Sequence, residues 1–304
     1  MKKVIFLATI LVILISFLIL DLTSGKDKQL ISPMLSRGKA LGLNQWFPRQ
    51  VLGTQANALE ISAKSALFLE TKDGEVLFEK NAKEKLPVAS LVKVMTVLIA
   101  LENKGIDDEF LVSLRASEME PDKMFLIPGE KLTLKELLYG IFLISGNDAA
   151  EVIAEGTTGS REEFMELMNI KAQQLGMKDT YFANPTGFDE DVNNSYSTAY
   201  DLALLARYLI RHYPFVVEIS QTPHIYLPVT ENHQDYDMYT GINLVTTYPG
   251  VLGFKTGYTP EAGLTLITLA RKNGKEVIGV LLGTENRRNE ARELLDYSFK
   301  KLGV

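Results

Sequence analysis

Hydrophobic positions along the chain predict strands near both ends and helices between them. Toward the beginning, Ser65–Glu70 and Glu75–Glu79 are short apolar runs on either side of an Asp-Gly pair, which favours a β-hairpin. Toward the end, three runs rich in β-branched and apolar residues predict further strands, with an Asn-Gly turn between the last two. These runs are Val251–Gly257, Leu264–Arg271 and Val277–Gly283.

The middle of the chain has the character of helices. Two stretches are strongly apolar, two begin with Ser or Thr capping sequences, and a last one near the end is amphipathic. The predicted helices are Leu86–Leu101, Leu132–Ile144, a segment from Ser160 to about Gly176, one from Thr198 through Arg211, and Asn286–Leu302. Strands at both ends around a helical middle indicate an α+β fold, in which an antiparallel sheet flanked by helices carries a helical insertion.

An uncharged apolar run, Val4–Leu20, follows Lys2 and Lys3 at the start of the chain. Its 17 residues are at the short end of the length that spans a membrane, and a lysine pair before an apolar run is also the layout of a secretory signal. Of a small-x-small cleavage pattern, only Ser24 is present. We therefore expect residues 1–21 to be a retained membrane anchor, with a cleaved signal as the alternative.

Residues 22–59 show no sustained periodicity and contain several Pro and Gly, which predicts a linker before a folded domain over residues 60–304. Residues 1–50 hold seven Lys and Arg and two Asp, a charge of +5, so the remainder carries −11 while the whole chain carries −6. A basic stretch beside an apolar one is typical of contact with anionic lipid or wall polymer, and a solvated linker has the same composition. Because basic residues lie on both sides of the apolar run, charge alone does not set its orientation.

Composition narrows the class of protein. Of the 304 residues, 46% are hydrophobic and 23% charged, as in folded globular proteins. A net charge of −6 argues against a nucleic-acid partner, because duplex binding needs a clustered basic face. The chain has no cysteine, which excludes a thiol nucleophile, disulfides and thiolate metal sites.

Lys93 lies in a segment that is otherwise almost entirely apolar. From Val88 to Leu101, the polar residues besides it are Ser90 and Thr96. A helix that is apolar all round is buried, and a buried ammonium is costly unless it is paired or loses its proton. The alternative, a lysine whose charged end reaches solvent, needs a polar face that this segment does not offer.

Ser90 precedes Lys93 by three residues, which is one helical turn on the same face. A serine hydroxyl becomes nucleophilic when a neighbouring base takes its proton, and a lysine with a lowered pKa can do so where an arginine cannot. Ser90 also falls at the expected start of the helix, where backbone N–H groups favour developing negative charge. The Ser-x-x-Lys spacing is common by chance, and its apolar setting is what makes this pair a candidate nucleophile and base.

Two further short motifs carry polar groups. Ser145–Asn147, a Ser-Gly-Asn sequence, follows a predicted helix, and by itself it is typical of a helix connector. Lys255–Gly257, a Lys-Thr-Gly sequence, lies in a predicted strand. There the cation and hydroxyl suit a substrate carboxylate, and the glycine lets a peptide backbone approach closely. An exposed strand lysine before a turn is the alternative.

In this order, the three motifs resemble the set found in penicillin-binding proteins and class A β-lactamases, with Ser-Gly-Asn in place of Ser-Asp-Asn. Residues from about 60 to 304 resemble the serine D-Ala-D-Ala carboxypeptidases, the low-molecular-mass penicillin-binding proteins. The segments that carry the resemblance are Pro87–Lys93, Ser145–Ala150, Asn184–Gly187, Tyr196–Asp201 and Gly250–Thr259.

The resemblance implies a β-lactamase/transpeptidase-like fold and an enzyme outside the cytoplasmic membrane. Its substrates would be peptidoglycan stem peptides, its covalent inhibitors β-lactam antibiotics, and no metal or organic cofactor would take part. Ser90 would attack the carbonyl of the terminal D-Ala-D-Ala bond, with Lys93 as its base. Ser145 would relay a proton toward the leaving amine, and Asn147 would orient the substrate amide and Lys93.

The resemblance also assigns the strand motif. Lys255 and Thr256 would bind the terminal carboxylate, beside Gly257. The backbone N–H groups of Ser90 and Tyr258 would form the oxyanion hole, after which water hydrolyses the acyl-enzyme.

Many members of the family continue into a β-rich domain and an amphipathic anchor. Here Val304 follows the last predicted helix, so the expectation is that Val4–Leu20 provides the anchoring.

Several alternatives stay open. A β-lactamase of the same fold would need fast deacylation, and the sequence nearest to the class A glutamate motif, Glu166–Asn169, lies inside a predicted helix. A DD-endopeptidase or transpeptidase uses the same residues. A catalytically silent wall-binding scaffold is disfavoured by the complete residue set. A Ser-His-Asp hydrolase is disfavoured because His212, His224 and His233 lie in no recognisable motif.

Overall fold

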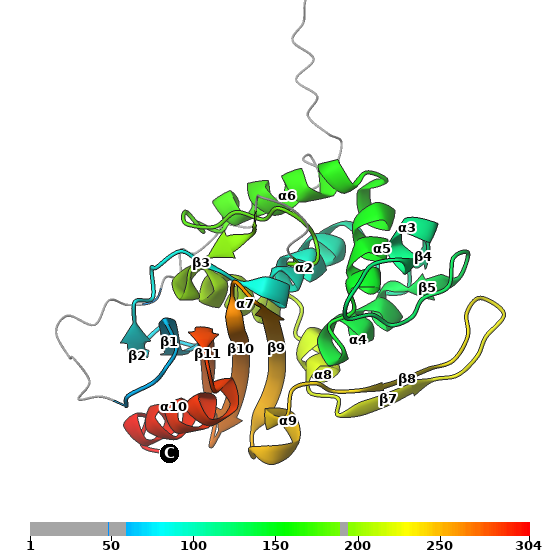
Figure 1. Ribbon diagram of the computed structural model, residues 1–304. Helices are drawn as coiled ribbons and strands as arrows, with labels where there is room; N and C mark the ends of the chain where they lie inside the picture. Colours follow the sequence, from blue (N-terminus) through cyan, green and yellow to red (C-terminus); the bar gives the residue numbers. More distant parts are fainter. Residues whose placement is uncertain (1–47, 49–58, 189–193) are drawn as a thin grey trace, which may run out of the picture. The chain divides into compact units, whose positions relative to one another are not determined.

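The computed structural model describes residue 48 and residues 59–188 and 194–304 (Figure 1). The predicted anchor or signal, residues 1–21, and all of the predicted linker except residues 48 and 59 lie outside the described part of the chain. Among the described residues, no helix combines the length and the apolar character needed to cross a membrane.

A five-stranded antiparallel sheet joins the two ends of the described domain. Its strands are β1 (Ser65–Glu70), β2 (Val76–Lys80), β9 (Val251–Thr259), β10 (Gly263–Lys272) and β11 (Lys275–Thr284). Their order is β2-β1-β11-β10-β9, so the first strand pairs with the last, with Ser65 opposite Leu282, and β9 is an edge strand. The predicted antiparallel sheet, built from both ends of the chain, is confirmed.

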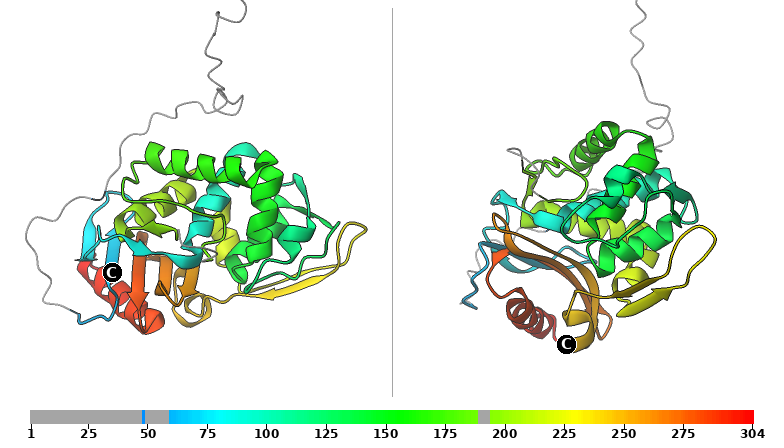
Figure 2. Two further views of the ribbon diagram at one scale, coloured as in Figure 1. Left: turned by 45° about the horizontal axis from the view of Figure 1, so that its top comes forward. Right: turned by 45° about the vertical axis from the view of Figure 1, so that its right-hand side comes forward.

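The sheet is buried on both faces. In β1, Leu67 and Leu69 belong to the core on the helical side, whereas Ala66 and Phe68 pack on the side of α10 (Arg287–Lys301), because successive side chains of a strand point to opposite faces. Burial on both faces explains why these strands are continuous apolar runs and not alternating ones. Figures 1 and 2 show α10 on one face of the sheet and the helices of the middle segment on the other.

The helical middle surrounds α2, which is buried from Lys93 to Leu101 and contacts four other helices. A 3-10 turn, η1 (Ala89–Val92), leads into it. The helices of this part are α2 (Lys93–Asn103), α3 (Leu114–Ser117), α4 (Leu134–Leu143), α5 (Asn147–Thr158), α6 (Arg161–Gln174), α7 (Ala199–His212) and α8 (Phe215–Ser220), and α9 (Leu244–Thr247) precedes β9.

Three short antiparallel pairs connect these helices. They are β3 (Leu86–Pro87) with β6 (Tyr196–Ser197), β4 (Glu109–Leu111) with β5 (Lys131–Thr133), and β7 (His224–Leu227) with β8 (Tyr236–Tyr239). The pair β7–β8 extends from the helical part as a long hairpin (Figure 1). The sequence did not predict any of these strands, because each is too short for a periodic pattern.

The capping sequences work as predicted. The Ser160 hydroxyl accepts a hydrogen bond from the backbone N–H of Glu163 at the start of α6, and the Thr198 hydroxyl accepts one from Asp201 at the start of α7. Gly176, with a φ of 78°, follows the end of α6 in the left-handed conformation that glycine adopts easily.

The predicted helix Leu86–Leu101 is wrong at its start. Its first residues form β3, and Ala89 has a φ of 49°, so the α-helix begins only at Lys93. The proline in β3 lacks a backbone N–H and biases the residue before it toward an extended conformation. As a result, Ser90 lies in the 3-10 turn before the helix and not in the first helical turn.

The predicted helix Leu132–Ile144 also begins later, at Leu134, because Thr133 is its N-cap. The Thr133 hydroxyl accepts from the backbone N–H of Glu136, and the Glu136 carboxylate accepts from the backbone N–H of Thr133. The residues just before the helix belong to β5. The apolar pattern runs through strand and helix alike, so periodicity does not reveal the boundary between them.

Candidate active site

Ser90 lies in η1 at a point where the chain closes around it from two sides. The carbonyl of Ala89 lies so near Gly187 that a Cβ there would be 2.0 Å from it. On the other side, a Cβ at Gly257 of β9 would lie 2.9 Å from the backbone nitrogen of Ser90. Two glycines therefore let the loop before residue 188 and the edge strand approach the serine. The sequence associated Gly257 with an approaching substrate, and in the structure the backbone it admits is that of Ser90.

Lys93 is fully buried, yet every N–H of its amine has a partner. Its Nζ lies 2.9 Å from Ser90 Oγ, 2.7 Å from Asn147 Oδ1 and 2.6 Å from the carbonyl oxygen of Thr186. A buried amine is tolerated only when it is satisfied in this way. The predicted burial of Lys93 and its contact with Ser90 are both present.

The same three partners suit a neutral amine. The Asn147 and Thr186 oxygens are carbonyls that can only accept, so they occupy two N–H groups of Lys93. The Ser90 hydroxyl can donate as well as accept, and with a neutral amine it donates to the nitrogen lone pair. This is the arrangement in which Lys93 removes the proton of Ser90.

The two buried lysines of the site have depressed pKa values. Burial lowers the pKa of Lys93 well below its ordinary value of 10.5, and the charge of Lys255 lowers it further, against the opposing charges of Asp122 and Asp148. Burial also lowers the pKa of Lys255, to about 7, where Asp122 opposes the change and Arg287 adds to it. Near neutral pH this favours a neutral Lys93, while Lys255 retains a share of the charge.

Lys255 forms the second serine–lysine contact of the site. Its Nζ donates to Ser145 Oγ at 2.8 Å and to the Thr256 carbonyl at 2.7 Å. Ser145 has a φ of 65°, an uncommon conformation for a residue with a side chain and one that recurs at functional sites. The sequence between α4 and α5 is thus a helix connector, as its composition indicates, and it also brings Ser145 to Lys255.

Asn147 lies at the start of α5 and connects the lysine to the loop between α3 and β5. Its Oδ1 accepts from Lys93, and its Nδ2 donates to the Glu120 carbonyl at 2.8 Å. Because both ends of the amide are engaged, its orientation is fixed. The bond between Asn147 and Lys93 thus places the Ser-Gly-Asn motif beside the Ser-x-x-Lys motif.

The edge strand β9 carries the third motif. The Thr256 carbonyl accepts from the neighbouring lysine amine at the free edge of β9, whereas the Gly257 carbonyl points the other way and accepts from Arg287 at 2.9 Å. Backbone groups of every second residue in a strand point the same way, so the N–H of Tyr258 points to the same side of β9 as the Thr256 carbonyl. That N–H and the N–H of Ser90 fit the oxyanion hole that the resemblance implied.

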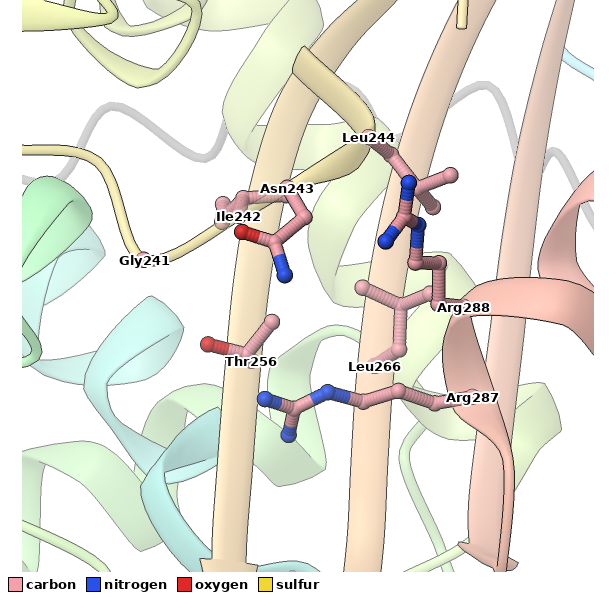
Figure 3. Close-up of a pocket in the computed structure, with 8 residues that line it drawn as sticks. All are labelled: Gly241, Ile242, Asn243, Leu244, Thr256, Leu266, Arg287 and Arg288. Atoms are coloured by element: carbon pink, nitrogen blue, oxygen red, sulfur yellow. The ribbon is translucent and has the colours of Figure 1, made fainter. Parts of the chain in front are cut away.

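Next to Thr256 lies a small cavity of about 40 Å³. Figure 3 shows the amide of Asn243 and the guanidinium of Arg287 beside Thr256, whose hydroxyl points away from Arg287, and the side chain of Leu266 between Arg287 and Arg288. A guanidinium and an amide beside one cavity suit an anionic group. Arg287 was not identified from the sequence, because it lies beside Arg288 at the start of α10, far along the chain from every motif.

The loop Asn184–Gly187 supplies the third acceptor of Lys93. Asn184 Oδ1 accepts from the backbone N–H groups of Thr186 and Gly187, and its Nδ2 donates to the Phe188 carbonyl. These bonds fold the loop so that the Thr186 carbonyl points at Lys93. The loop contributed to the family resemblance, but a role through a backbone carbonyl cannot be recognised from residue types.

The segment nearest to a class A glutamate motif has a packing role. Glu166 lies on the exposed side of α6, and the side chain of Asn169 bonds both the N–H and the carbonyl of Phe182. The three histidines, His212, His224 and His233, bond to neighbours elsewhere, and within the described chain none hydrogen-bonds to Ser90. In the same part of the chain, no three acidic or histidine side chains gather as a metal site.

Comparison with known proteins identifies a family that this chain matches and individual proteins that are similar to it. A sequence profile of the family described as D-alanyl-D-alanine carboxypeptidase matches residues 51–286. A D-alanyl-D-alanine carboxypeptidase of Bacillus subtilis is 40% identical over 257 residues, which are 82% of this chain and 65% of that protein. The chain therefore spans slightly less than two thirds of the length of this relative.

Solved structures share the fold. A variant of a Streptomyces DD-transpeptidase has a TM-score of 0.75 and 27% identity, over 80% of this chain and 100% of its own. A penicillin-binding protein of Listeria monocytogenes with bound cefotaxime has a TM-score of 0.67 and 30% identity, over 80% of this chain and 99% of its own. The predicted α+β fold of the β-lactamase/transpeptidase type is confirmed.

The buried, acceptor-rich setting of Lys93 leads to a testable prediction. The arginine in Lys93→Arg is positively charged at every accessible pH, so it cannot accept the proton of Ser90. Acylation of Ser90 by a small activated ester should fall by about 10²–10⁴-fold, the usual contribution of a general base, and should not recover at alkaline pH. Circular dichroism would check that the variant is folded. Substantial acylation by the folded arginine variant would show that Lys93 acts only as a fixed charge.

Proposed function

This chain belongs to the D-alanyl-D-alanine carboxypeptidase family, and we propose that it is a serine carboxypeptidase that removes the terminal D-Ala of peptidoglycan stem peptides. The observation that carries the proposal is the 2.9 Å contact between Lys93 Nζ and Ser90 Oγ in a site where a second lysine holds a second serine. β-Lactam antibiotics offer a reactive carbonyl and a carboxylate to the same groups, so they act as covalent inhibitors.

Acylation begins with the Ser90 hydroxyl. Neutral Lys93 takes its proton as Ser90 Oγ bonds to the carbonyl carbon of the D-Ala-D-Ala amide. The carbonyl oxygen becomes an oxyanion, which the N–H groups of Ser90 and Tyr258 stabilise. The terminal carboxylate lies beside Lys255 and Thr256, and it aligns the scissile bond with the nucleophile.

Collapse of the oxyanion breaks the carbon–nitrogen bond. The proton that Lys93 took from Ser90 passes through the hydroxyl of Ser145, which Lys255 holds at 2.8 Å, to the leaving nitrogen, so that Lys93 is neutral again. D-Ala departs and leaves an ester on Ser90. Lys93 then takes a proton from the water that attacks the ester carbonyl and returns it to Ser90 Oγ as the shortened peptide is released.

Transpeptidation is the second candidate, because a DD-transpeptidase is among the structural relatives. An amine acceptor in place of water uses the same acyl-enzyme, and DD-endopeptidase action differs only in the leaving group. The products from a defined cross-linked and uncross-linked muropeptide separate these three reactions. A β-lactamase is disfavoured, since Glu166 is exposed on α6, and a persistent penicilloyl adduct would argue against it directly.

We also propose that Val4–Leu20 keeps the protein at the membrane with the enzyme on the outer side, where peptidoglycan lies. The support is the uncharged apolar run and the poor cleavage pattern after it.

The nucleophile is tested by Ser90→Ala. Without the hydroxyl, no acyl-enzyme forms, so release of D-Ala from a stem peptide and labelling by a fluorescent penicillin should both vanish. Ser117→Ala is the matched control, because the Ser117 hydroxyl, at the end of α3, donates to the backbone carbonyl of Leu114. This variant should leave the release of D-Ala and the labelling unchanged. Intact-mass and peptide mapping locate the label, and a label on any other serine would disprove the assignment.

The carboxylate site is tested with the substrate. A peptide that ends in D-Ala-D-Ala amide cannot form the charge-assisted bonds to Lys255 and Thr256, so its kcat/KM should be about 10–100-fold lower than that of the free acid. In Lys255→Gln that difference should shrink. Equal rates for acid and amide in the wild type would contradict the role.

The anchor is tested by removing residues 1–24. The shortened protein should be soluble and keep full activity, while the full-length protein should fractionate with membranes. Sequencing of the mature N-terminus checks the alternative, because a start near Gly25 would indicate a cleaved signal.

A further inference from the structure

Arg287, at the start of α10, bonds the backbone of the edge strand. Its Nη1 donates to the Gly257 carbonyl of β9 at 2.9 Å and lies 3.5 Å from the Thr265 carbonyl of β10. Within the described chain, its side chain hydrogen-bonds to these two carbonyls and pairs with no carboxylate. The charge of this half-buried guanidinium is therefore directed at backbone carbonyl groups, and the shorter bond goes to Gly257.

The Gly257 carbonyl and the Tyr258 N–H belong to one peptide group. This peptide is trans, so the two groups point in opposite directions within one plane. The carbonyl points to Arg287, and the N–H therefore points to the free edge of β9. The backbone nitrogen of Ser90 lies close by, since a Cβ at Gly257 would be 2.9 Å from it. Arg287 thus bonds one end of the peptide whose other end lies beside the nucleophile.

A cation at the carbonyl end of a peptide changes its N–H end. A charge-assisted bond to the oxygen draws electron density from the peptide nitrogen, and hydrogen bonds through one peptide group strengthen one another. The N–H of Tyr258 is then a better donor, and the plane of the peptide is fixed. A guanidinium suits this task, because it keeps its charge even where burial lowers the pKa of Arg287.

We propose that Arg287 is a positioning residue of the oxyanion hole, which orients and polarises the Tyr258 N–H through the Gly257–Tyr258 peptide. This rests on the proposed function only in taking Ser90 as the nucleophile and the Tyr258 N–H as a donor to the oxyanion.

This role predicts a loss in the chemical step and not in binding. The oxyanion forms only as the reaction proceeds, so a weaker donor lowers kcat and the rate of acylation and leaves KM nearly unchanged. Removal of a whole oxyanion-hole donor costs about 10²–10³-fold in kcat. In Arg287→Met the donor remains but is weaker, so we expect a loss of about 5–30-fold. Arg287→Lys keeps a cation and should recover most of the rate.

A direct bond to the substrate carboxylate is the competing role, because Arg287 also lines the cavity beside Thr256. The two roles differ in the substrate that is affected. If Arg287 acts on the oxyanion hole, kcat for a peptide acid and for the matching peptide amide falls by the same factor. A loss confined to the acid, mainly in KM, would overturn the proposal. Rates are compared at the pH of maximum activity of each protein, since the charge of Arg287 also lowers the pKa of Lys255.

Arg292→Met is the matched control. Arg292 is exposed on the same helix and does not line the cavity, so this variant removes the same charge and should leave kcat unchanged. Circular dichroism checks that each variant is folded, and Arg287→Gln is the second neutral variant, should the methionine variant fail to fold.

Two spectroscopic measurements need no turnover. The 15N shift of an amide responds to the hydrogen bond at the preceding carbonyl, so in protein labelled with 15N-tyrosine the Tyr258 resonance should move in Arg287→Met. Tyr258→Phe assigns that resonance. In the adduct of Ser90 with a 13C-labelled penicillin, the infrared stretch of the ester carbonyl should move to higher frequency, because the bond from the Tyr258 N–H is weaker.

These measurements separate the inference from the proposed function. A moved Tyr258 resonance and a higher ester frequency in Arg287→Met support the inference even if the wild type releases no D-Ala. An unchanged resonance or ester frequency, or an equal change in Arg292→Met, overturns it. A fall in rate that Arg287→Lys does not relieve, without a spectroscopic change, also overturns it, because a merely structural role has that signature.

Discussion

The burial of the Lys93 amine is the constraint on which the rest of the site depends. An amine without access to solvent must find hydrogen-bond partners within the protein, and here its three partners come from three distant parts of the chain: η1, the start of α5 and the loop before residue 188. If any of them moved, a buried polar group would be left unmatched at a cost of about 1–3 kcal/mol. Because the buried amine of Lys93 needs hydrogen-bond partners, its bond to Ser90 Oγ also fixes the position of the nucleophile.

The fold explains how these parts meet. Strands from both ends of the chain form one sheet, and the helical segment inserted between them returns to its edge strand β9. An edge strand has unpaired backbone groups, which are a liability on a protein surface. In this domain η1 covers β9 at Gly257, and on the free edge of the strand the Thr256 carbonyl accepts from the amine of Lys255. The same edge supplies Lys255, whose amine reaches across to the helical side at Ser145.

Sequence reasoning found the groups whose chemistry is unusual for their surroundings. Lys93 could be recognised because a charge stood in an apolar segment, and the strands and capped helices could be recognised because they are long or carry caps. What it missed was of two kinds. The late start of α2 depends on a positive φ at Ala89. Alanine does not favour this conformation, so it cannot be predicted from the residue type. The Thr186 carbonyl acts through a backbone atom, and Arg287 lies at the start of α10 far along the chain from the other site residues, so neither forms a motif.

The two lysines are chemically alike, and their different tasks follow from their surroundings and from the substrate. Burial lowers the pKa of both, and the charge of Lys255 lowers the pKa of Lys93 further. A carboxylate that arrives beside Lys255 and Thr256 favours the proton on Lys255. That charge in turn favours the neutral form of Lys93, the form that can accept the proton of Ser90. Recognition of a free carboxylate and activation of the serine are then linked by one electrostatic coupling. A substrate without that carboxylate loses a binding contact and also the bias that prepares the base, so its defect should extend to kcat as well as KM.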